Sequence, residues 1–185
     1  MALASSVPTI LRLADWEALE HDPLRPLELV RGVPVVLPRP VVTHQHGIYR
    51  LCRLLEDRLP AELIALPEVE VLLEGDPRPT ARTPDVIVVR RDLLRAHLPR
   101  AAAADVVLAV EVLSPGTART DTVTTLVEYA DAGIGAYWIV DLDPPVTLTA
   151  HVLVDGDYEI TAKASGDVDL LTPVPLTLPL DRLRP

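Results

Sequence analysis

The sequence predicts an α+β fold in which helices flank a mixed central β-sheet. Apolar runs of strand length recur along the whole chain, whereas only residues 43–59 and 121–132 have the apolar periodicity of long helices. Residues 106–113 are almost entirely aliphatic, and an aliphatic run without polar alternation is typical of a strand covered on both faces. With 185 residues and no linker-like stretch, the chain is expected to form one domain over residues 1–185.

The N-terminal part should contain a short helix followed by a β-hairpin. Leu13, Trp16 and Leu19 have helical spacing, which predicts a helix over residues 13–21. Residues 27–37 form two β-prone stretches joined at Arg31-Gly32, as in a hairpin. A proline cannot donate to a β-ladder, so Pro34 places the second strand at an edge or at a strand start.

Two long amphipathic helices are expected. The first covers residues 43–59 with Thr43 as its N-cap, and the second covers residues 121–132 with Gly133 as its C-cap. Their apolar stripes, which should face the core, are Ile48, Leu51, Leu55 and Leu59 in the first helix and Val123, Leu126, Val127 and Ala130 in the second.

The remaining elements should complete one sheet. Strands are expected at residues 63–66, 69–73, 86–89, 106–113, 136–140, 146–153 and 157–162, with a short helix at 92–97 and a hairpin turn at Asp155-Gly156.

Two carboxylates are tied to the apolar strands. Asp85 precedes a β-branched run, and Glu111 lies within another, where an ionised carboxylate costs several kcal/mol unless a cation or donors meet it. A divalent cation such as Mg²⁺ takes one or two carboxylates together with backbone oxygens, waters and substrate phosphates. The pair therefore suggests half of a divalent-metal site. The alternative is that both acids lie in solvent at strand ends, or pair with Arg82 and Arg119.

Composition narrows the class of protein. The single cysteine excludes an internal disulfide and a cysteine-based zinc cluster. No window approaches the roughly 18 apolar residues of a membrane span, and the N-terminus lacks the pattern of a signal peptide, so a cytoplasmic protein without membrane contact is expected. A net charge of −10 argues against broad nucleic-acid contact. A local basic patch is still available from Arg78, Arg82, Arg90, Arg91, Arg95 and Arg119.

A set of short motifs resembles a known family. Pro84-Asp85 is followed by Glu111-Val112-Leu113-Ser114-Pro115, then by Asp121, Tyr129, Ala132-Gly133-Ile134 and residues 137–141 (YWIVD), with residues 27–32 (LELVRG) and His44-Gln45 upstream. This order and spacing, over roughly residues 10–160, is similar to the Uma-type "putative restriction endonuclease" family of the PD-(D/E)XK nuclease superfamily.

The resemblance implies a restriction-endonuclease-like core and Mg²⁺- or Mn²⁺-dependent hydrolysis of DNA. Asp85 and Glu111 would be catalytic metal ligands, and the backbone carbonyl of Val112 or Leu113 could add a third oxygen. Glu28, His44 and Asp121 would support the site. Glu128 is expected to be solvated, and a homodimer is expected because exposed sheet edges and apolar surface often close by pairing.

The chain departs from the family at the lysine position. The superfamily lysine would be at Leu113, and the family lysine, four residues after Asp121, would be at Thr125. Three interpretations stay open. In the first, catalysis depends on the metal alone or on a substituting arginine (Arg82 or Arg119). In the second, the protein is an inactive regulatory module that binds DNA or protein. In the third, activity needs a partner subunit.

Overall fold

A six-stranded mixed sheet forms the centre of the molecule. The computed structural model describes residues 10–19, 26–113 and 120–184. The central sheet has the order β11-β10-β9-β8-β6-β3. Its strands are β3 (Leu63–Pro67), β6 (Val86–Arg90), β8 (Val106–Leu113), β9 (Ala136–Asp141), β10 (Thr147–Val154) and β11 (Asp157–Ser165). Within this sheet, as far as the structure describes it, β8 and β9 are the one parallel pair, because α3 connects them.

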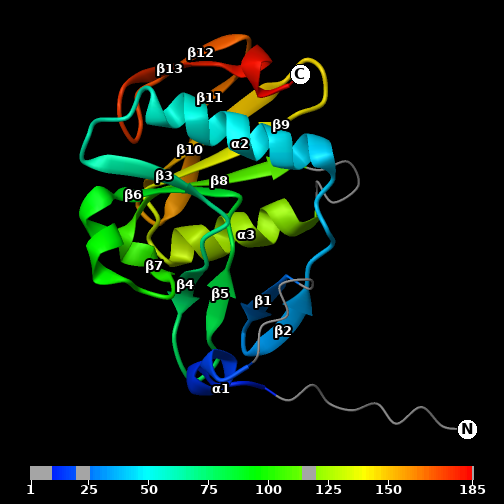
Figure 1. The fold of residues 1–185 in the computed structure, drawn as a ribbon, viewed down its shortest axis with the longest axis vertical. Helices are drawn as coiled ribbons and strands as arrows, with labels where there is room; N and C mark the ends of the chain where they lie inside the picture. Colours follow the sequence, from blue (N-terminus) through cyan, green and yellow to red (C-terminus); the bar gives the residue numbers. More distant parts are fainter. Residues whose placement is uncertain (1–9, 20–25, 114–119, 185) are drawn as a thin grey trace, which may run out of the picture.

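One long helix covers each face of this sheet. Alternate residues of β8 point to opposite faces, so Leu108, Val110 and Val112 pack with α2 (Val42–Glu56), while Ala109 packs on the side of α3 (Thr120–Asp131). Figure 1 shows the two helices on opposite sides of the strands. The predicted α+β fold with a mixed central sheet flanked by helices is therefore confirmed.

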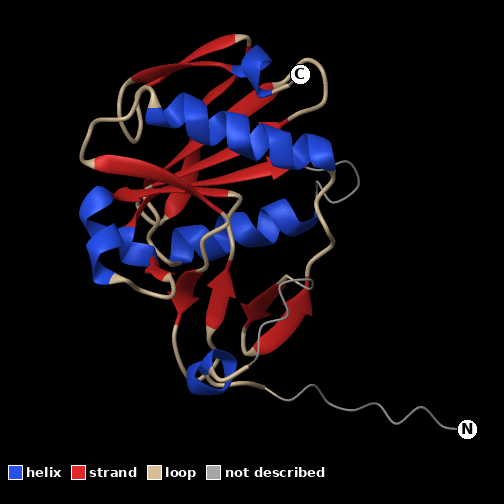
Figure 2. Ribbon diagram, viewed as in Figure 1, coloured by secondary structure: helices blue, strands red, loops and turns tan. Residues whose placement is uncertain are grey.

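A second sheet, which the sequence did not separate from the first, extends from one end of the core. Its order is β2-β1-β5-β4-β7, and α1 (Leu13–Glu17) packs against it. The strands are β1 (Leu27–Val30), β2 (Val33–Val36), β4 (Val71–Glu74), β5 (Thr80–Arg82) and β7 (Ala101–Ala102). Figure 2 shows these strands below the central sheet. Strand β2 lies at the edge, as Pro34 predicts.

The turn between β1 and β2 has the predicted form. Arg31 (φ 49°) and Gly32 (φ 79°) both have positive φ, as a tight hairpin turn requires. A Cβ at Gly32 would lie 2.8 Å from the carbonyl oxygen of Leu11, so only glycine fits there.

The C-terminal segment forms elements beyond the predicted end of the sheet at residue 162. β12 (Asp167–Leu170) pairs with β13 (Leu176–Pro179), and η3 (Leu180–Leu183) follows. Their buried side chains join the core cluster around α2, which explains their apolar pattern. Two other short 3₁₀ helices are η1 (Arg91–Ala96), close to the predicted residues 92–97, and η2 (Ala103–Asp105).

One prediction about the long helices was wrong, and another was right only in part. Val41, not Thr43, is the N-cap of α2, and no side chain caps this end. In α3 two of the four predicted stripe residues, Val123 and Val127, are 67% and 51% exposed, whereas Ala130 is buried and Leu126 packs against the core, as predicted. Thr125 and Tyr129, which lay outside the predicted stripe, are also buried. Apolar spacing misled here because the inward face of α3 carries polar groups. Gly133 does end α3 with φ 78°, as predicted.

No helix among the described residues has the length and hydropathy needed to cross a bilayer.

The single thiol provides a test of the packing between α2 and the sheet. Burial and the charge of Glu56 raise the pKa of Cys52 to about 11 from 9.0. At pH 8 the thiolate fraction should therefore be roughly 100-fold lower than in the unfolded chain. We expect a correspondingly slow reaction with Ellman's reagent, and a fast one in concentrated urea. Equal rates in both conditions would contradict the packing of α2.

Candidate functional site

Asp85 and Glu111 lie side by side at the ends of adjacent antiparallel strands. Val86 pairs with Val110 in the β6–β8 ladder, so the next residues outward are Asp85 and Glu111. The backbone N–H of Val112 donates to Oδ2 of Asp85 at 2.7 Å, which ties the first acid to the strand of the second. Both side chains are partly buried. The structure thus brings the two predicted acids together.

The environment of Glu111 opposes its negative charge. Burial and the charge of Asp85 raise the pKa of Glu111 well above 4.5, even though a hydrogen bond from Tyr129 lowers it. The Tyr129 hydroxyl donates to Oε1 at 2.8 Å, and burial and Glu111 raise the pKa of this hydroxyl in turn. A cation at this position would relieve the repulsion between the two carboxylates.

The backbone carbonyl of Val112 points toward the end of β6 where Asp85 lies. Within a strand, the N–H and C=O of one residue point to the same neighbour, and the Val112 N–H points at Asp85. Pro84, just before Asp85, has no N–H with which to pair this carbonyl. The Val112 oxygen therefore lies on the side of β8 where Asp85 is.

His44 reaches the site from the first turn of α2. Its Nε2 lies 3.0 Å from Oδ1 of Asp85, and its side chain is 8% exposed. Burial alone would lower the pKa of His44, but the hydrogen bond to Asp85 and the charges of Asp85 and Glu68 raise it. His44 thus orients Asp85.

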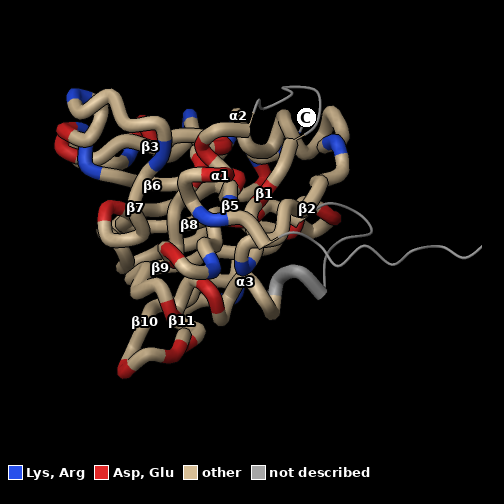
Figure 3. The backbone as a smooth tube through the Cα atoms, turned by 90° about the horizontal axis from the view of Figure 1, so that it is seen from below, with Lys and Arg blue, Asp and Glu red and all other residues tan. Residues whose placement is uncertain are grey.

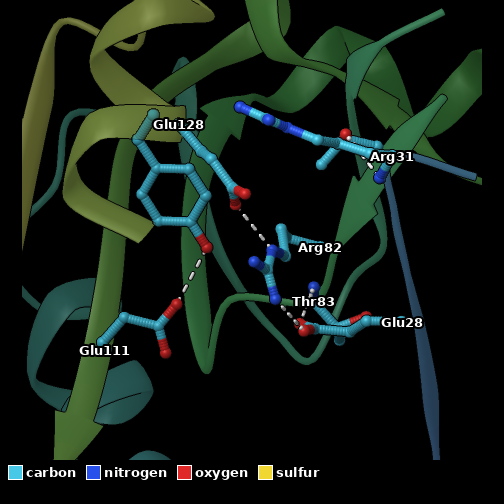
Figure 4. A network of polar contacts seen from close by, with 8 residues as sticks. Glu28, Arg31, Arg82, Thr83, Glu111 and Glu128 are labelled. Carbon is cyan, nitrogen blue, oxygen red and sulfur yellow. Dashed lines mark hydrogen bonds and ion pairs between the residues drawn. The ribbon is translucent and has the colours of Figure 1, made fainter. Parts of the chain in front are cut away.

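A second network of charges joins the smaller sheet to α3. The guanidinium of Arg82 donates through Nη1 to Glu28 and through Nε to Glu128, both at 2.8 Å. The second oxygen of Glu28 accepts the backbone N–H of Thr83 at 2.8 Å. Figure 4 shows Arg82 between the two carboxylates, with Glu111 to one side and the Arg31 side chain extending past the network.

Two expectations are corrected by this network. Asp85 does not pair with Arg82, because both oxygens of Asp85 have other donors and the arginine is engaged elsewhere. Glu128 is not solvated, since its side chain is 15% exposed and paired. Glu128 and Tyr129 lie three and four residues after Thr125 in α3, and this helical spacing to the family lysine position could have flagged both residues as candidates.

The family lysine position lies on the same face of α3. Thr125 is buried and lies one turn before Glu128 and Tyr129. Asp121 belongs to α3, but its side chain is outside the described part of the chain, and Arg119 lies outside it altogether.

A second tyrosine, Tyr137, packs against Tyr129, the residue that binds Glu111. Tyr137 is fully buried, and its ring meets that of Tyr129 edge-on with centroids 5.3 Å apart. Its hydroxyl has no hydrogen-bond partner among the described residues. Burial and the charge of Glu111 raise the pKa of Tyr137. The sequence carries no signal that Tyr137 approaches the acids.

The donors collected here match the preferences of a hard divalent cation. Among the described residues, no three His, Cys, Asp or Glu side chains converge on one point as a fully protein-ligated ion requires. The site instead offers two carboxylates and a carbonyl, which suits Mg²⁺ because this ion keeps several waters and takes few protein ligands. Four carboxylates, from Glu28, Asp85, Glu111 and Glu128, lie around the guanidinium of Arg82, so the region also attracts cations.

Comparisons with known proteins identify the family and the fold of the chain. The family model Uma2, described as "Putative restriction endonuclease", matches residues 13–181. The fold is similar to the crystal structure of a protein from Anabaena variabilis described as "a putative nuclease belonging to DUF820". The TM-score is 0.68 and the identity is 18%, over 94% of this chain and 97% of the other. No curated protein matches the sequence.

Proposed function

Because the chain belongs to the Uma2 family, we propose that it is a divalent-metal-dependent endonuclease that hydrolyses phosphodiester bonds in DNA. The observation that carries the proposal is the pairing of Asp85 and Glu111 at the ends of adjacent strands, beside the Val112 carbonyl. The proposal includes a homodimer and a cytoplasmic location, as expected from the sequence.

In this proposal each residue has a distinct role. Asp85, Glu111 and the Val112 carbonyl hold Mg²⁺ or Mn²⁺. Such an ion lowers the pKa of a bound water and polarises a phosphoryl oxygen. His44 and the Val112 N–H keep Asp85 in one orientation, and Tyr129 does the same for Glu111.

DNA would have to approach a surface of mixed charge. Arg90 and Arg91 lie at the end of β6 remote from Asp85, about 16 Å away at roughly 3.3 Å per residue. The predicted basic patch is therefore divided, and Figure 3 shows basic and acidic segments interspersed on the face seen from below. Arg31 is exposed beside the Arg82 network and is the better candidate for a phosphate contact near the acids.

Thr125 supports a second candidate function. The family's lysine position carries a neutral side chain that is buried on the face of α3 next to the acids. An inactive protein that binds DNA or protein would keep this fold without the lysine. The affinity of such a protein for DNA would be independent of metal and would fall steeply with salt.

A metal titration combined with a cleavage assay tests the two functions. We expect wild type to bind Mn²⁺ in calorimetry and to nick supercoiled DNA slowly in Mg²⁺ or Mn²⁺ but not in EDTA. Thr125→Lys should raise the metal-dependent rate by about 10-fold or more, since charge stabilisation in phosphoryl transfer is worth several kcal/mol. Absence of metal binding, together with no gain from the lysine, would rule out the nuclease and leave the binding function.

A further inference from the structure

The acids of the site leave one requirement unmet. Hydrolysis of a phosphodiester builds negative charge on the phosphoryl oxygens, and fixed cationic donors stabilise that charge. Thr125 supplies no charge. The guanidinium of Arg82 does, and its partner Glu128 is followed in α3 by Tyr129, whose hydroxyl donates to Glu111.

The geometry points to Arg82 as a catalytic residue that contacts the scissile phosphate and stabilises its developing charge. This inference rests on the proposed nuclease function and adds a residue to its site. Because a guanidinium stays protonated, Arg82 cannot act as the base, so its role is confined to hydrogen bonding and charge.

The guanidinium of Arg82 has N–H groups that its two carboxylate partners do not use. Of its five N–H groups, one on Nε and one on Nη1 bond to Glu128 and Glu28. The remaining three, two of them on Nη2, have no hydrogen-bond partner within the described residues. In Figure 4, Nη2 lies on the side of the guanidinium nearer Glu111. Planar forks of this kind suit the paired oxygens of a phosphate.

The two carboxylates hold the guanidinium in place before substrate arrives. Glu28 comes from β1 and Glu128 from α3, so Arg82 is fixed from both sides, and its side chain is only 14% exposed. Glu28 also binds the Thr83 N–H, two residues before Asp85, which links the position of the arginine to that of the acid. Preorganised donors stabilise a transition state without a cost of reorientation during the reaction.

The chain contains a matched control for a purely structural role. Arg100 donates through Nε to Glu70 at 2.6 Å and through Nη1 to Glu17 at 2.7 Å, and its side chain is 13% exposed. Its ion pairs and burial therefore match those of Arg82, but among the described residues its partners are Glu70 and Glu17, not the residues that bind Asp85 or Glu111. If Arg82 only tied elements together, replacing either arginine would have similar effects.

The test compares full-length wild type with Arg82→Gln, Arg82→Lys and Arg100→Gln. We expect Arg82→Gln to lower the single-turnover cleavage rate at saturating Mn²⁺ by about 100-fold or more, with Mn²⁺ affinity within about threefold of wild type. Without metal, its DNA affinity should be weaker, and the slope of log K against log salt should fall by about 1, as for one lost phosphate contact. Arg100→Gln should match wild type in cleavage, Mn²⁺ affinity and salt slope.

Two further variants separate charge from structure. Arg82→Lys keeps a cation for Glu28 and Glu128 but lacks the planar fork, so it should cleave at an intermediate rate. Adding Thr125→Lys to Arg82→Gln should restore part of the rate, which a structural role for Arg82 does not predict. If circular dichroism shows Arg82→Gln unfolded, Arg82→Lys decides, and a rate equal to wild type overturns the proposal.

The outcomes distinguish this inference from the nuclease proposal. Wild type that neither binds Mn²⁺ nor cleaves DNA overturns both. Wild type that cleaves, with folded Arg82→Gln within about threefold of its rate, overturns only the role of Arg82. Equal losses in Arg82→Gln and Arg100→Gln also overturn that role alone.

Discussion

Glu111→Gln is expected to abolish metal-dependent cleavage, with a loss of roughly 1,000-fold or more. The carboxylate is one of two proposed ligands, and the charge stabilisation that a bound ion supplies is worth several kcal/mol, each 1.36 kcal/mol being tenfold in rate. An amide keeps the shape of the side chain and can still accept the hydrogen bond from Tyr129. The change therefore tests the charge rather than the packing.

The same substitution should stabilise the protein in the absence of metal. Because burial and Asp85 raise the pKa of Glu111 above 4.5, the folded state holds its proton more tightly than the unfolded state. The contribution of Glu111 to stability therefore falls as pH rises from 4.5 through the raised pKa. Near pH 7, Glu111→Gln should have the higher Tm, and that part of the pH dependence should disappear.

Divalent metal should reverse the order of the two Tm values, so that wild type becomes the more stable protein. Mn²⁺ is expected to raise the Tm of wild type by mass action and to leave Glu111→Gln nearly unchanged. The Tm of both proteins is measured by thermal unfolding at several pH values, with Mn²⁺ or with EDTA. Glu159→Gln, at an exposed position of β11, serves as the control. A Glu111→Gln protein that still gains stability from Mn²⁺ and cleaves DNA would show that Glu111 is not a ligand.

Leu108→Ala should cause the largest loss of stability among simple core truncations of β8. Leu108 is fully buried in the centre of β8, on the face that packs against α2. A buried leucine cut to alanine costs about 2–5 kcal/mol, because the transfer free energy is lost and a cavity remains. For a chain of this size the Tm should fall by roughly 5–20 °C.

Exposed Val127→Ala provides the contrast. Sequence periodicity placed Val127 in the buried stripe of α3, but the side chain is 51% exposed, so its truncation should change stability by less than about 0.5 kcal/mol. Urea unfolding of both variants tests the orientation of α3 and the burial of β8 together. A cost for Val127→Ala that approached that of Leu108→Ala would mean that α3 packs with a different face inward, or that Val127 lies in a subunit interface.

Local sequence determined the elements that have strong patterns of their own. The run of residues 106–113, aliphatic except for Glu111, predicted a strand covered on both faces, and it forms the central strand β8. Helix α2 follows from its apolar spacing, and Arg31-Gly32 fixes a hairpin because both residues take positive φ. Asp85 and Glu111 were found for the same reason, since charges at buried strands are rare.

The tertiary structure decided which polar groups meet. Nothing in the local pattern shows that β1 and β5 leave the central sheet and bring Glu28 and Arg82 to the face of Glu128 on α3. These residues are up to 100 positions apart in the sequence, and only the packing of three elements sets their distances. The same packing explains the error in α3. A helix that faces a polar site buries Thr125 and Tyr129 and leaves its valines in solvent, so hydrophobic periodicity alone selects a face that is only partly the buried one.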